Sequence, residues 1–170
     1  MGQRHTVYLK WSAAEITPEE LLAGIQEVDL SWIAEVCDVP GERIDEAIKP
    51  LRIENMRPPG FVFYRLYYRP GDVRQVDIDR WRTAEEIRGE VEEVMENLDP
   101  ETGSSEKVRQ YLKACVDTVS ASYGGMPGEA MAPILASEVC RWLAEKFGGI
   151  IRDPCGDWYE LGEWPDLKHL

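Results

Sequence analysis

The sequence predicts an α+β fold, in which a mostly antiparallel sheet is covered by several helices. Two observations lead to this class. Segments with a strand pattern occur near the N-terminus, in the middle and near the C-terminus, and amphipathic helical segments separate them. The chain has 170 residues, of which 44% are hydrophobic and 30% charged, so it is long enough to bury a core. We therefore expect one α+β domain over residues 1–170.

The N-terminal segment predicts a strand followed by a helix. Residues 5–11 alternate between polar and apolar side chains, which is typical of a half-buried strand. Thr17 and Glu20 have the spacing of a capping box, and Pro18 suits the first turn of the helix that it would open. The buried side of that helix would consist of Leu21, Leu22 and Ile25.

Residues 31–52 have a helix–break–helix pattern, with the break at Val39-Pro40-Gly41. This pattern resembles a helix-turn-helix and is followed by strands, as in a winged helix. A transcriptional regulator that uses residues 31–82 is therefore one alternative. DNA phosphates would repel the acids of the second helix, so we expect a structural helical hairpin and consider nucleic acid an unlikely partner. These acids are Glu42, Asp45 and Glu46, against Arg43 and Lys49.

Residues 61–68 and 73–81 predict a β-hairpin that turns at Pro70-Gly71-Asp72. A two-residue loop would place Val76 and Ile78 on the face of Arg65. A three-residue loop sets Arg65 opposite Asp77 and Phe61 opposite Trp81, and we expect this register because a one-residue slip would flip every side chain. It groups the apolar side chains of Val62, Tyr64, Leu66, Tyr68, Val76 and Ile78 on one face.

The other face of this hairpin is too aromatic to be left simply in water. Either another element covers it or it belongs to a binding surface, and both alternatives stay open. The side chains that it presents are Phe61, Phe63, Arg65, Tyr67, Asp77, Asp79 and Trp81.

Three helices and two strands are predicted after the hairpin. Thr83 and Glu86 form a second capping box, and the helix that follows has an apolar stripe that includes Ala84. A further helix is expected from about Ser104 to Tyr123, and a third from near Glu129 to Phe147, where Gly148 ends it. Residues 150–152 and 158–161 predict two strands, and residues 162–170 an irregular tail.

The formal net charge is −13, from 19 basic and 32 acidic residues, and it is unevenly distributed. Residues 83–106 contain nine acids against Arg88 alone, whereas residues 49–82 contain eight bases against four acids. The acidic helix is either a solvated face or a surface for a basic partner, since its like-charged pairs at helical spacing cost stability. Such a chain is a poor candidate for binding anionic membranes. No apolar run approaches the roughly 20 residues of a membrane span, so we expect a cytoplasmic protein.

The sequence predicts no catalytic residues, cofactor or metal site. The four cysteines are widely spaced, which favours reduced thiols, and His5 and His169 lie at the two termini. Asp77 and Asp79 share a strand face with Arg65, so an enzyme with an unrecognised site there is a second alternative. A cross-strand ion pair between Arg65 and Asp77 explains these residues more simply. A cluster of arginines could hold an anion or an acidic peptide, but we expect it to balance the acidic helices. Its members are Arg65, Arg69, Arg74, Arg80 and Arg82.

Residues 130–161 resemble the small bacterial immunity proteins of polymorphic toxin systems. The resemblance depends on a helix with Leu135, Ala136, Val139 and Leu143-Ala144-Glu145, then Phe147-Gly148-Gly149-Ile150-Ile151-x-Asp153, and Trp158. It implies a non-enzymatic inhibitor that occludes the active site of a toxin.

The charge distribution is compatible with this implied role, because an acidic domain can bind a basic toxin with electrostatic steering. Aromatic side chains commonly supply the anchors of such an interface. We therefore expect a basic protein partner, steered by Glu86, Glu90, Glu93, Glu96 and Asp99 and anchored by Phe63, Tyr67 and Trp81. The oligomeric state is left open.

Overall fold

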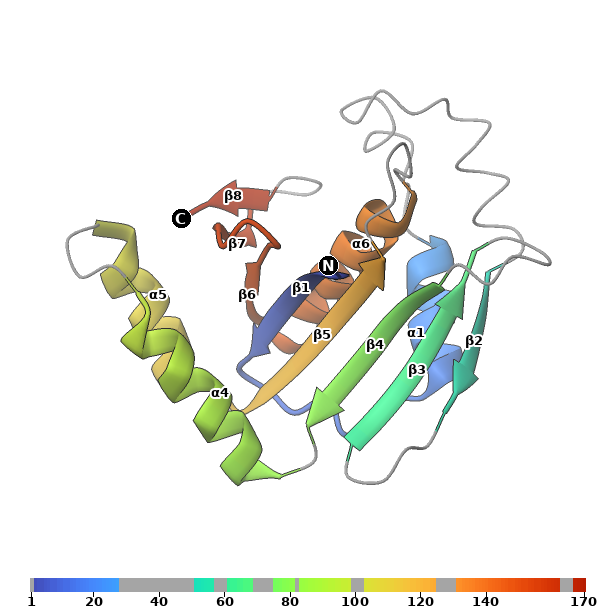
Figure 1. Ribbon diagram of the computed structural model, residues 1–170, viewed down its shortest axis with the longest axis horizontal. Coiled ribbons are helices and arrows are strands. Elements are labelled where there is room, and N and C mark those ends of the chain that lie inside the picture. The colour runs from blue at the N-terminus through green and yellow to red at the C-terminus, as the bar shows by residue number, and fades with distance from the viewer. Residues whose placement is uncertain are drawn as a thin grey trace.

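The computed structural model describes residues 2–27, 51–56, 61–68, 75–81, 83–98, 103–124, 131–162 and 167–170. Eight strands form a single antiparallel sheet in the order β2-β3-β4-β5-β1-β6-β7-β8, which confirms the α+β class (Figure 1). The strands are β1 (Gly2–Leu9), β2 (Arg52–Asn55), β3 (Phe61–Tyr67), β4 (Gln75–Trp81), β5 (Asp117–Gly124), β6 (Gly149–Arg152), β7 (Trp158–Leu161) and β8 (Leu167–His169). The helices are α1 (Pro18–Glu27), α4 (Ala84–Glu96), α5 (Gly103–Lys113) and α6 (Met131–Phe147).

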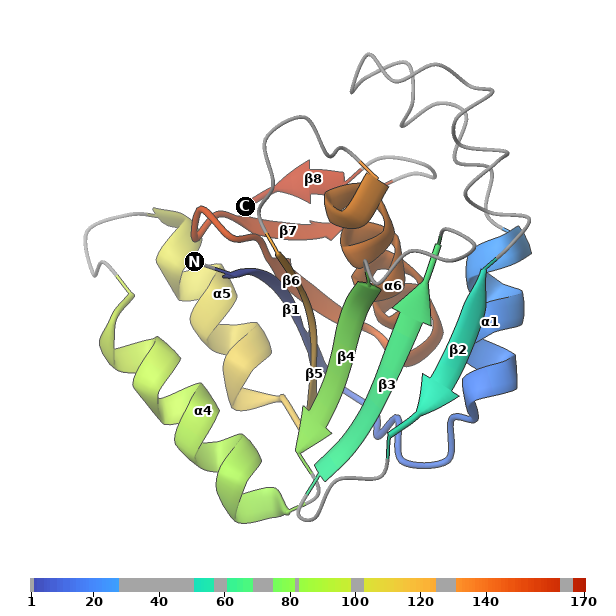
Figure 2. The same cartoon turned by 45° about the vertical axis from the view of Figure 1, so that its right-hand side comes forward.

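Helices lie on both sides of the sheet (Figures 1 and 2). α6 and α1 pack on one side, here called the α6 face, and bury the larger core, which includes Leu9, Leu66 and Leu135. α4 and α5 pack on the other side, here called the α4 face, over a smaller core centred on Tyr8, Leu112 and Trp158. Alternation along each strand separates the two cores: Val7 and Leu9 belong to the first, and Tyr8 to the second.

The predicted hairpin register is confirmed. Arg65 pairs with Asp77 and Phe61 with Trp81, as the three-residue loop requires, although residues 69–74 lie outside the described part. Both strands are interior, because β3 also pairs with β2 and β4 also pairs with β5. The apolar side chains of Tyr64, Leu66, Val76 and Ile78 are buried on the α6 face.

The helix predicted from Ser104 to Tyr123 is wrong in its second half. α5 ends at Lys113, and residues 117–124 form β5, a central strand that pairs with both β1 and β4. The reason is a change of period: Thr118, Ser120 and Ser122 alternate with Val119, Ala121 and Tyr123, and only the second set reaches the larger core. Val116, which lies within the predicted helix, is in the connection before β5 and is 51% exposed.

Two smaller expectations are also corrected. The tail is not wholly irregular, since residues 167–169 form β8 and pair with β7. Ala84 is exposed, because at the first residue of α4 it lies before the first turn that contacts the sheet. Both predicted capping boxes are confirmed, at Thr17 and at Thr83. The predicted helix-turn-helix lies almost entirely outside the described residues.

Candidate functional site

The aromatic face predicted for the hairpin is the α4-facing surface of β3 and β4. The positions of the helices decide whether another element covers it. Neither of the described helices on this side crosses β2 or β3 (Figures 1 and 2), and α4 lies against β4 and β5 and contacts β1 through Glu90. The side chains on this surface are half-buried. Within the described residues, it is therefore accessible to a partner. We call it the hairpin surface, and it consists of Phe63, Arg65, Tyr67, Asp77, Asp79 and Trp81.

An ion pair and cation–π contacts restrict the positions of the side chains on the hairpin surface. The Arg65 Nε donates to Asp77 Oδ1 at 3.2 Å, which confirms the predicted ion pair, and the Gln75 amide donates to the same oxygen at 2.9 Å. The Arg65 guanidinium lies 5.5 Å from the centre of the Phe63 ring, and the Arg52 guanidinium lies 4.0 Å from that of Tyr67. Stacked rings and guanidinium groups of this kind are common at protein interfaces.

The five acids predicted to steer a partner differ in their roles. Glu86 belongs to the capping box of α4 and accepts from the Thr83 backbone N–H at 3.2 Å. Glu90 turns toward the sheet, where its Oε1 accepts from Arg4 at 3.2 Å and from the Tyr8 hydroxyl at 3.5 Å. Glu93 and Glu96 are exposed, and Asp99 lies outside the described residues. Two of the five are thus free to act in steering.

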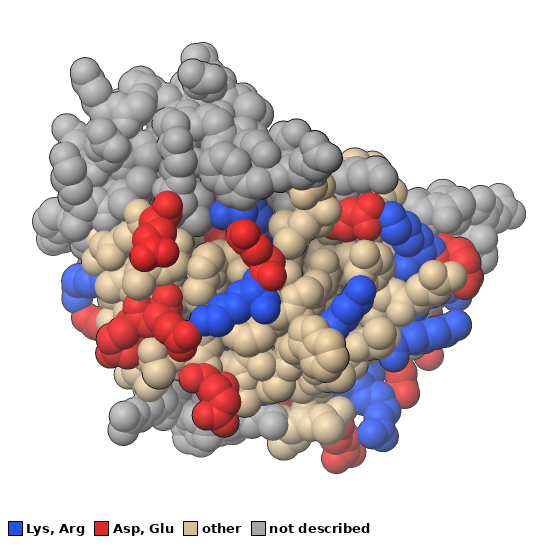
Figure 3. Space-filling view, turned by 180° about the vertical axis from the view of Figure 1, so that it is seen from behind, with Lys and Arg blue, Asp and Glu red and all other residues tan. Residues whose placement is uncertain are grey.

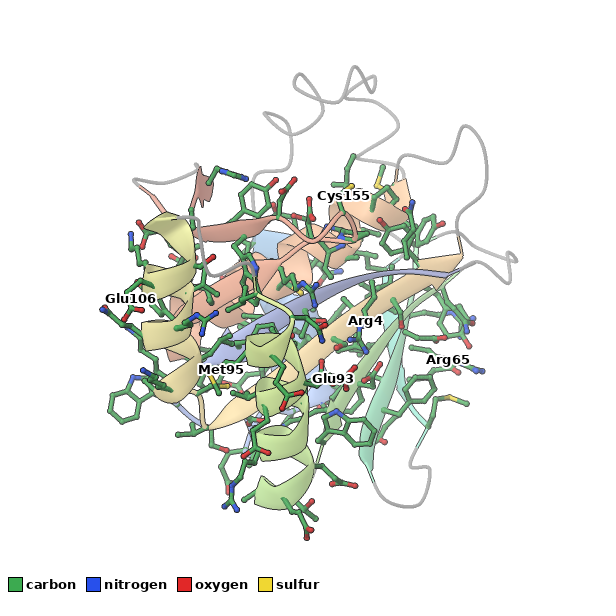
Figure 4. The ribbon with its side chains drawn as sticks, turned by 60° about the vertical axis from the view of Figure 1, so that its left-hand side comes forward. Arg4, Arg65, Glu93, Met95, Glu106 and Cys155 are labelled. Carbon is green, nitrogen blue, oxygen red and sulfur yellow. The ribbon has the colours of Figure 1, made fainter. Side chains whose placement is uncertain are left out.

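Figure 4 shows how these acids lie relative to the sheet. Glu93 is on the flank of α4 that faces Arg4, whereas Met95 is on the flank that faces α5, where it packs against the smaller core. Arg65 lies further along the same side of the sheet, on β3. Glu93 and the hairpin surface are therefore on the same side of the sheet, whereas Glu96 lines a shallow groove with Met95 and with Arg109 of α5.

Asp79 has an environment that the sequence did not reveal. Burial raises its pKa to about 6, and the neighbouring carboxylates of Glu90 and Asp77 add to this shift while Arg4 opposes it. Glu90 comes from α4, so this environment exists only in the folded chain. A carboxyl group with such a pKa can exchange a proton near neutral pH, which is the property that the enzyme alternative would need.

The predicted arginine cluster does not form on one face. Arg80 lies on the α6 face, where its Nε donates to the fully buried Asp117 at 2.7 Å, while Arg65 lies on the opposite face. Side-chain alternation along paired strands separates them. Arg69, Arg74 and Arg82 are outside the described residues. On the described part of the α6 face, acidic and basic side chains are interspersed (Figure 3).

Histidine and cysteine do not assemble into a site within the described ranges. His5 is buried and stacks on Tyr123 with 6.0 Å between the ring centres, and burial lowers its pKa. Cys115, Cys140 and Cys155 are free thiols, and Cys37 is not described. Among the residues that the structure describes, no three potential ligands lie close enough to hold a metal ion. No described helix is long and apolar enough to cross a membrane.

No family model, curated protein sequence or solved structure matches this chain. A functional interpretation therefore depends on the residues described above, and the resemblance of residues 130–161 to immunity proteins stays an expectation.

Proposed function

We propose that the chain is a non-enzymatic protein-binding domain that neutralises a basic bacterial toxin. The observation that carries the proposal is that the hairpin surface and the exposed Glu93 of α4 lie on the same side of the sheet. Acids at the margin of an interface attract a basic partner, and half-buried aromatic side chains at its centre supply contact area. The resemblance of residues 130–161 to immunity proteins supports the same function.

The structure refines which residues would perform each role. Phe63, Tyr67 and Trp81 keep the anchoring role, since all three lie on the hairpin surface. Glu93 and Glu96 keep the steering role because they are exposed. Glu86 and Glu90 are engaged within the fold, so their substitution would alter the cap of α4 or its attachment to β1.

The first test is whether the neighbouring gene encodes a toxin domain, and a domain found there is the partner to use. Expression of that domain alone should stop bacterial growth, and co-expression of this chain should restore it through a stable complex of the two purified proteins. Truncation of Trp81 to alanine should weaken the complex about tenfold or more if it is an anchor. A neighbouring toxin that stays active and unbound beside the folded chain would overturn the proposal.

Charge reversal tests the docking surface separately. The double substitution Glu93→Lys/Glu96→Lys should slow association several-fold at about 20 mM salt, and much less at about 300 mM, because salt screens exposed charges. The matched control is Glu15→Lys/Glu19→Lys, which changes the net charge equally at exposed positions in and before α1, on the α6 face. Equal slowing by both variants would show that net charge acts, and not this surface.

The winged-helix alternative agrees less well with the arrangement of the hairpin. A wing projects from its domain, whereas β3 and β4 are each paired on both sides within the sheet. A gel-shift assay in which DNA binding is absent at low salt would remove this alternative.

A further inference from the structure

An open pocket of about 510 Å³ lies on the α4 face, where the start of β1 meets the turn between β6 and β7. Arg4 and Thr6 of β1 and Arg152 of β6 line it, together with Gly2 and Gly156. Thr6 is the direct partner of Arg152 in the sheet, and Arg4 is the diagonal neighbour on the same face. Diagonal neighbours are about 7–8 Å apart, so two guanidinium groups and a hydroxyl converge on one space.

Arg152 has an uncompensated charge. No carboxylate lies within 4.0 Å of it in the described part of the chain, and its buried Nε has no hydrogen-bond acceptor there. Its guanidinium lies over Trp158, 5.7 Å from the ring centre, which restricts its position. The Tyr8 hydroxyl, which shares a side-chain hydrogen bond with Arg152, does not neutralise its charge: a phenol is uncharged at physiological pH, and burial and Glu90 raise the pKa of Tyr8 further. A buried donor without an acceptor costs about 1–3 kcal/mol, and a ligand oxygen would recover that cost.

Two acids belong to the surroundings of the pocket: Asp153 is among its lining residues, and Glu90 contacts Arg4. Asp153 follows the last residue of β6, and hydrogen bonds within the turn to β7 occupy its carboxylate. There its Oδ1 accepts from the backbone N–H groups of Cys155 and Asp157, both at 2.9 Å, and its Oδ2 from the Tyr159 hydroxyl at 3.4 Å. Glu90 Oε1 accepts from Arg4 at 3.2 Å and from the Tyr8 hydroxyl at 3.5 Å, and the Arg4 side chain stays 50% exposed.

We propose that this pocket binds an oxyanion, a phosphate group or a carboxylate, through Arg152 and Arg4. Arg152, half-buried and with a buried Nε, would provide the innermost charge, and Arg4 would close over the ligand from the solvent side. Thr6 would line the pocket between them, with its hydroxyl in a 3.1 Å hydrogen bond with that of Ser120. Guanidinium groups match the geometry of both ligand types because they donate two parallel hydrogen bonds. The pocket is separate from the hairpin surface, and the inference does not depend on the proposed function.

The test is a titration of the isotope-labelled protein with inorganic phosphate at low salt, followed by backbone and arginine Nε–H NMR signals. Saturable shifts should be confined to residues around the pocket and include the Arg152 Nε–H. Arg152→Gln should weaken binding roughly tenfold or more, since it removes a charge-assisted pair of hydrogen bonds. Arg4→Gln should weaken it less but clearly, and its exposed position leaves folding intact.

Arg88→Gln is the matched control, because Arg88 is exposed on α4 away from the pocket and the substitution removes the same charge. It should leave phosphate affinity unchanged. A parallel titration with acetate distinguishes the two sources of the oxyanion: tighter phosphate binding points to a phosphate ligand, and tighter acetate binding to a carboxylate. Shifts that do not saturate, or an equal loss in Arg88→Gln and Arg4→Gln, would overturn the proposal.

Discussion

At the scale of single residues, Asp117 is the most highly connected polar group described. Its Oδ2 accepts from the Ala13 N–H at 2.8 Å and from the Arg80 Nε at 2.7 Å, and its Oδ1 accepts from the Thr118 N–H at 2.9 Å. It thereby fixes the chain between β1 and α1 to the sheet. A carboxylate with no exposed surface is stable only when its acceptor positions are occupied in this way.

Asp117→Asn should lower the free energy of unfolding by about 3 kcal/mol or more, because it removes the charge that Arg80 needs and turns an acceptor into a donor. Denaturant unfolding measures the change. Glu54→Gln, which breaks the exposed ion pair with Arg52, should cost less than about 1 kcal/mol and serves as the control. A cost for Asp117→Asn as small as that of the control would show that the network contributes little.

Asp79 should make stability depend on pH. Its pKa in the folded chain is about 6, above the value of an unfolded chain, so the folded state holds the proton more tightly. Stability contributed by this group is therefore present below about pH 4 and is lost as pH rises to about 6. Asp79→Asn has no proton to lose, so relative to the wild type it should gain roughly 2–3 kcal/mol between pH 4 and pH 7.

Denaturant unfolding of both proteins across this pH range gives the difference directly. Asp77→Asn is a useful comparison because it removes a neighbouring carboxylate, which should lower the pKa of Asp79 and reduce the pH dependence. Parallel stability curves for the wild type and Asp79→Asn would contradict the environment described for this side chain.

At the scale of elements, the strand β6 begins at a glycine for a steric reason. A Cβ atom at Gly149 would lie 2.3 Å from the backbone oxygen of Tyr8, and backbone cannot move aside as a flexible side chain can. The preceding Gly148 has φ +65°, which ends α6. The two glycines together allow the chain to leave α6 and pair at once with β1.

Gly149→Ala should lower the free energy of unfolding by about 3–5 kcal/mol, because β6 must shift away from β1. Gly89→Ala provides the opposite control. Gly89 lies inside α4 with open space around its Cα, so alanine should stabilise the protein by about 0.5–1 kcal/mol through helix propensity. Thermal and denaturant unfolding of the two variants measure both effects. Equal stability of the two variants would contradict the close approach of β6 to β1.

The elements also show which parts of the fold were predictable. The hairpin register followed from local rules, since loop length and the apolar pattern of Leu66 and Val76 agreed on one pairing. β5 was missed because Tyr111, Leu112 and Cys115 continue an apolar helical pattern up to the point where the period changes to two. The alternation of Val119, Ala121 and Tyr123 with small polar residues was the signal that could have shown the strand.

The candidate site was predictable only in part, because its contacts join distant segments. Phe63, Tyr67 and Trp81 could be placed on one face from strand alternation alone. The contact between Arg4 and Glu90 spans 86 residues, and no local pattern predicts it. The same limit applies to Asp79, whose environment depends on α4, and to the pocket around Arg152, which requires β1 and β6 to be neighbours.

At the scale of the whole molecule, the two faces of the sheet are unequally stabilised. The core on the α6 face contains 24 buried residues among those described, and the core on the α4 face contains seven. Free energy gained from burial increases with apolar area, so the α4–α5 layer should be less firmly attached than α6. The proposed steering acids thus lie on the layer that opens more readily.

Native-state hydrogen exchange should detect this difference. Slowly exchanging amides of α6, β1 and β5 should exchange only through global unfolding, whereas those of α4 and α5 should exchange through a partial opening of lower free energy. Val91→Ala, in the smaller core, should speed exchange mainly in α4 and α5. Leu135→Ala, in the larger core, should lower the protection of every element, by about 2–5 kcal/mol for the amides that report global unfolding. If Val91→Ala lowered protection equally in α4 and α6, the two layers would unfold as one cooperative unit.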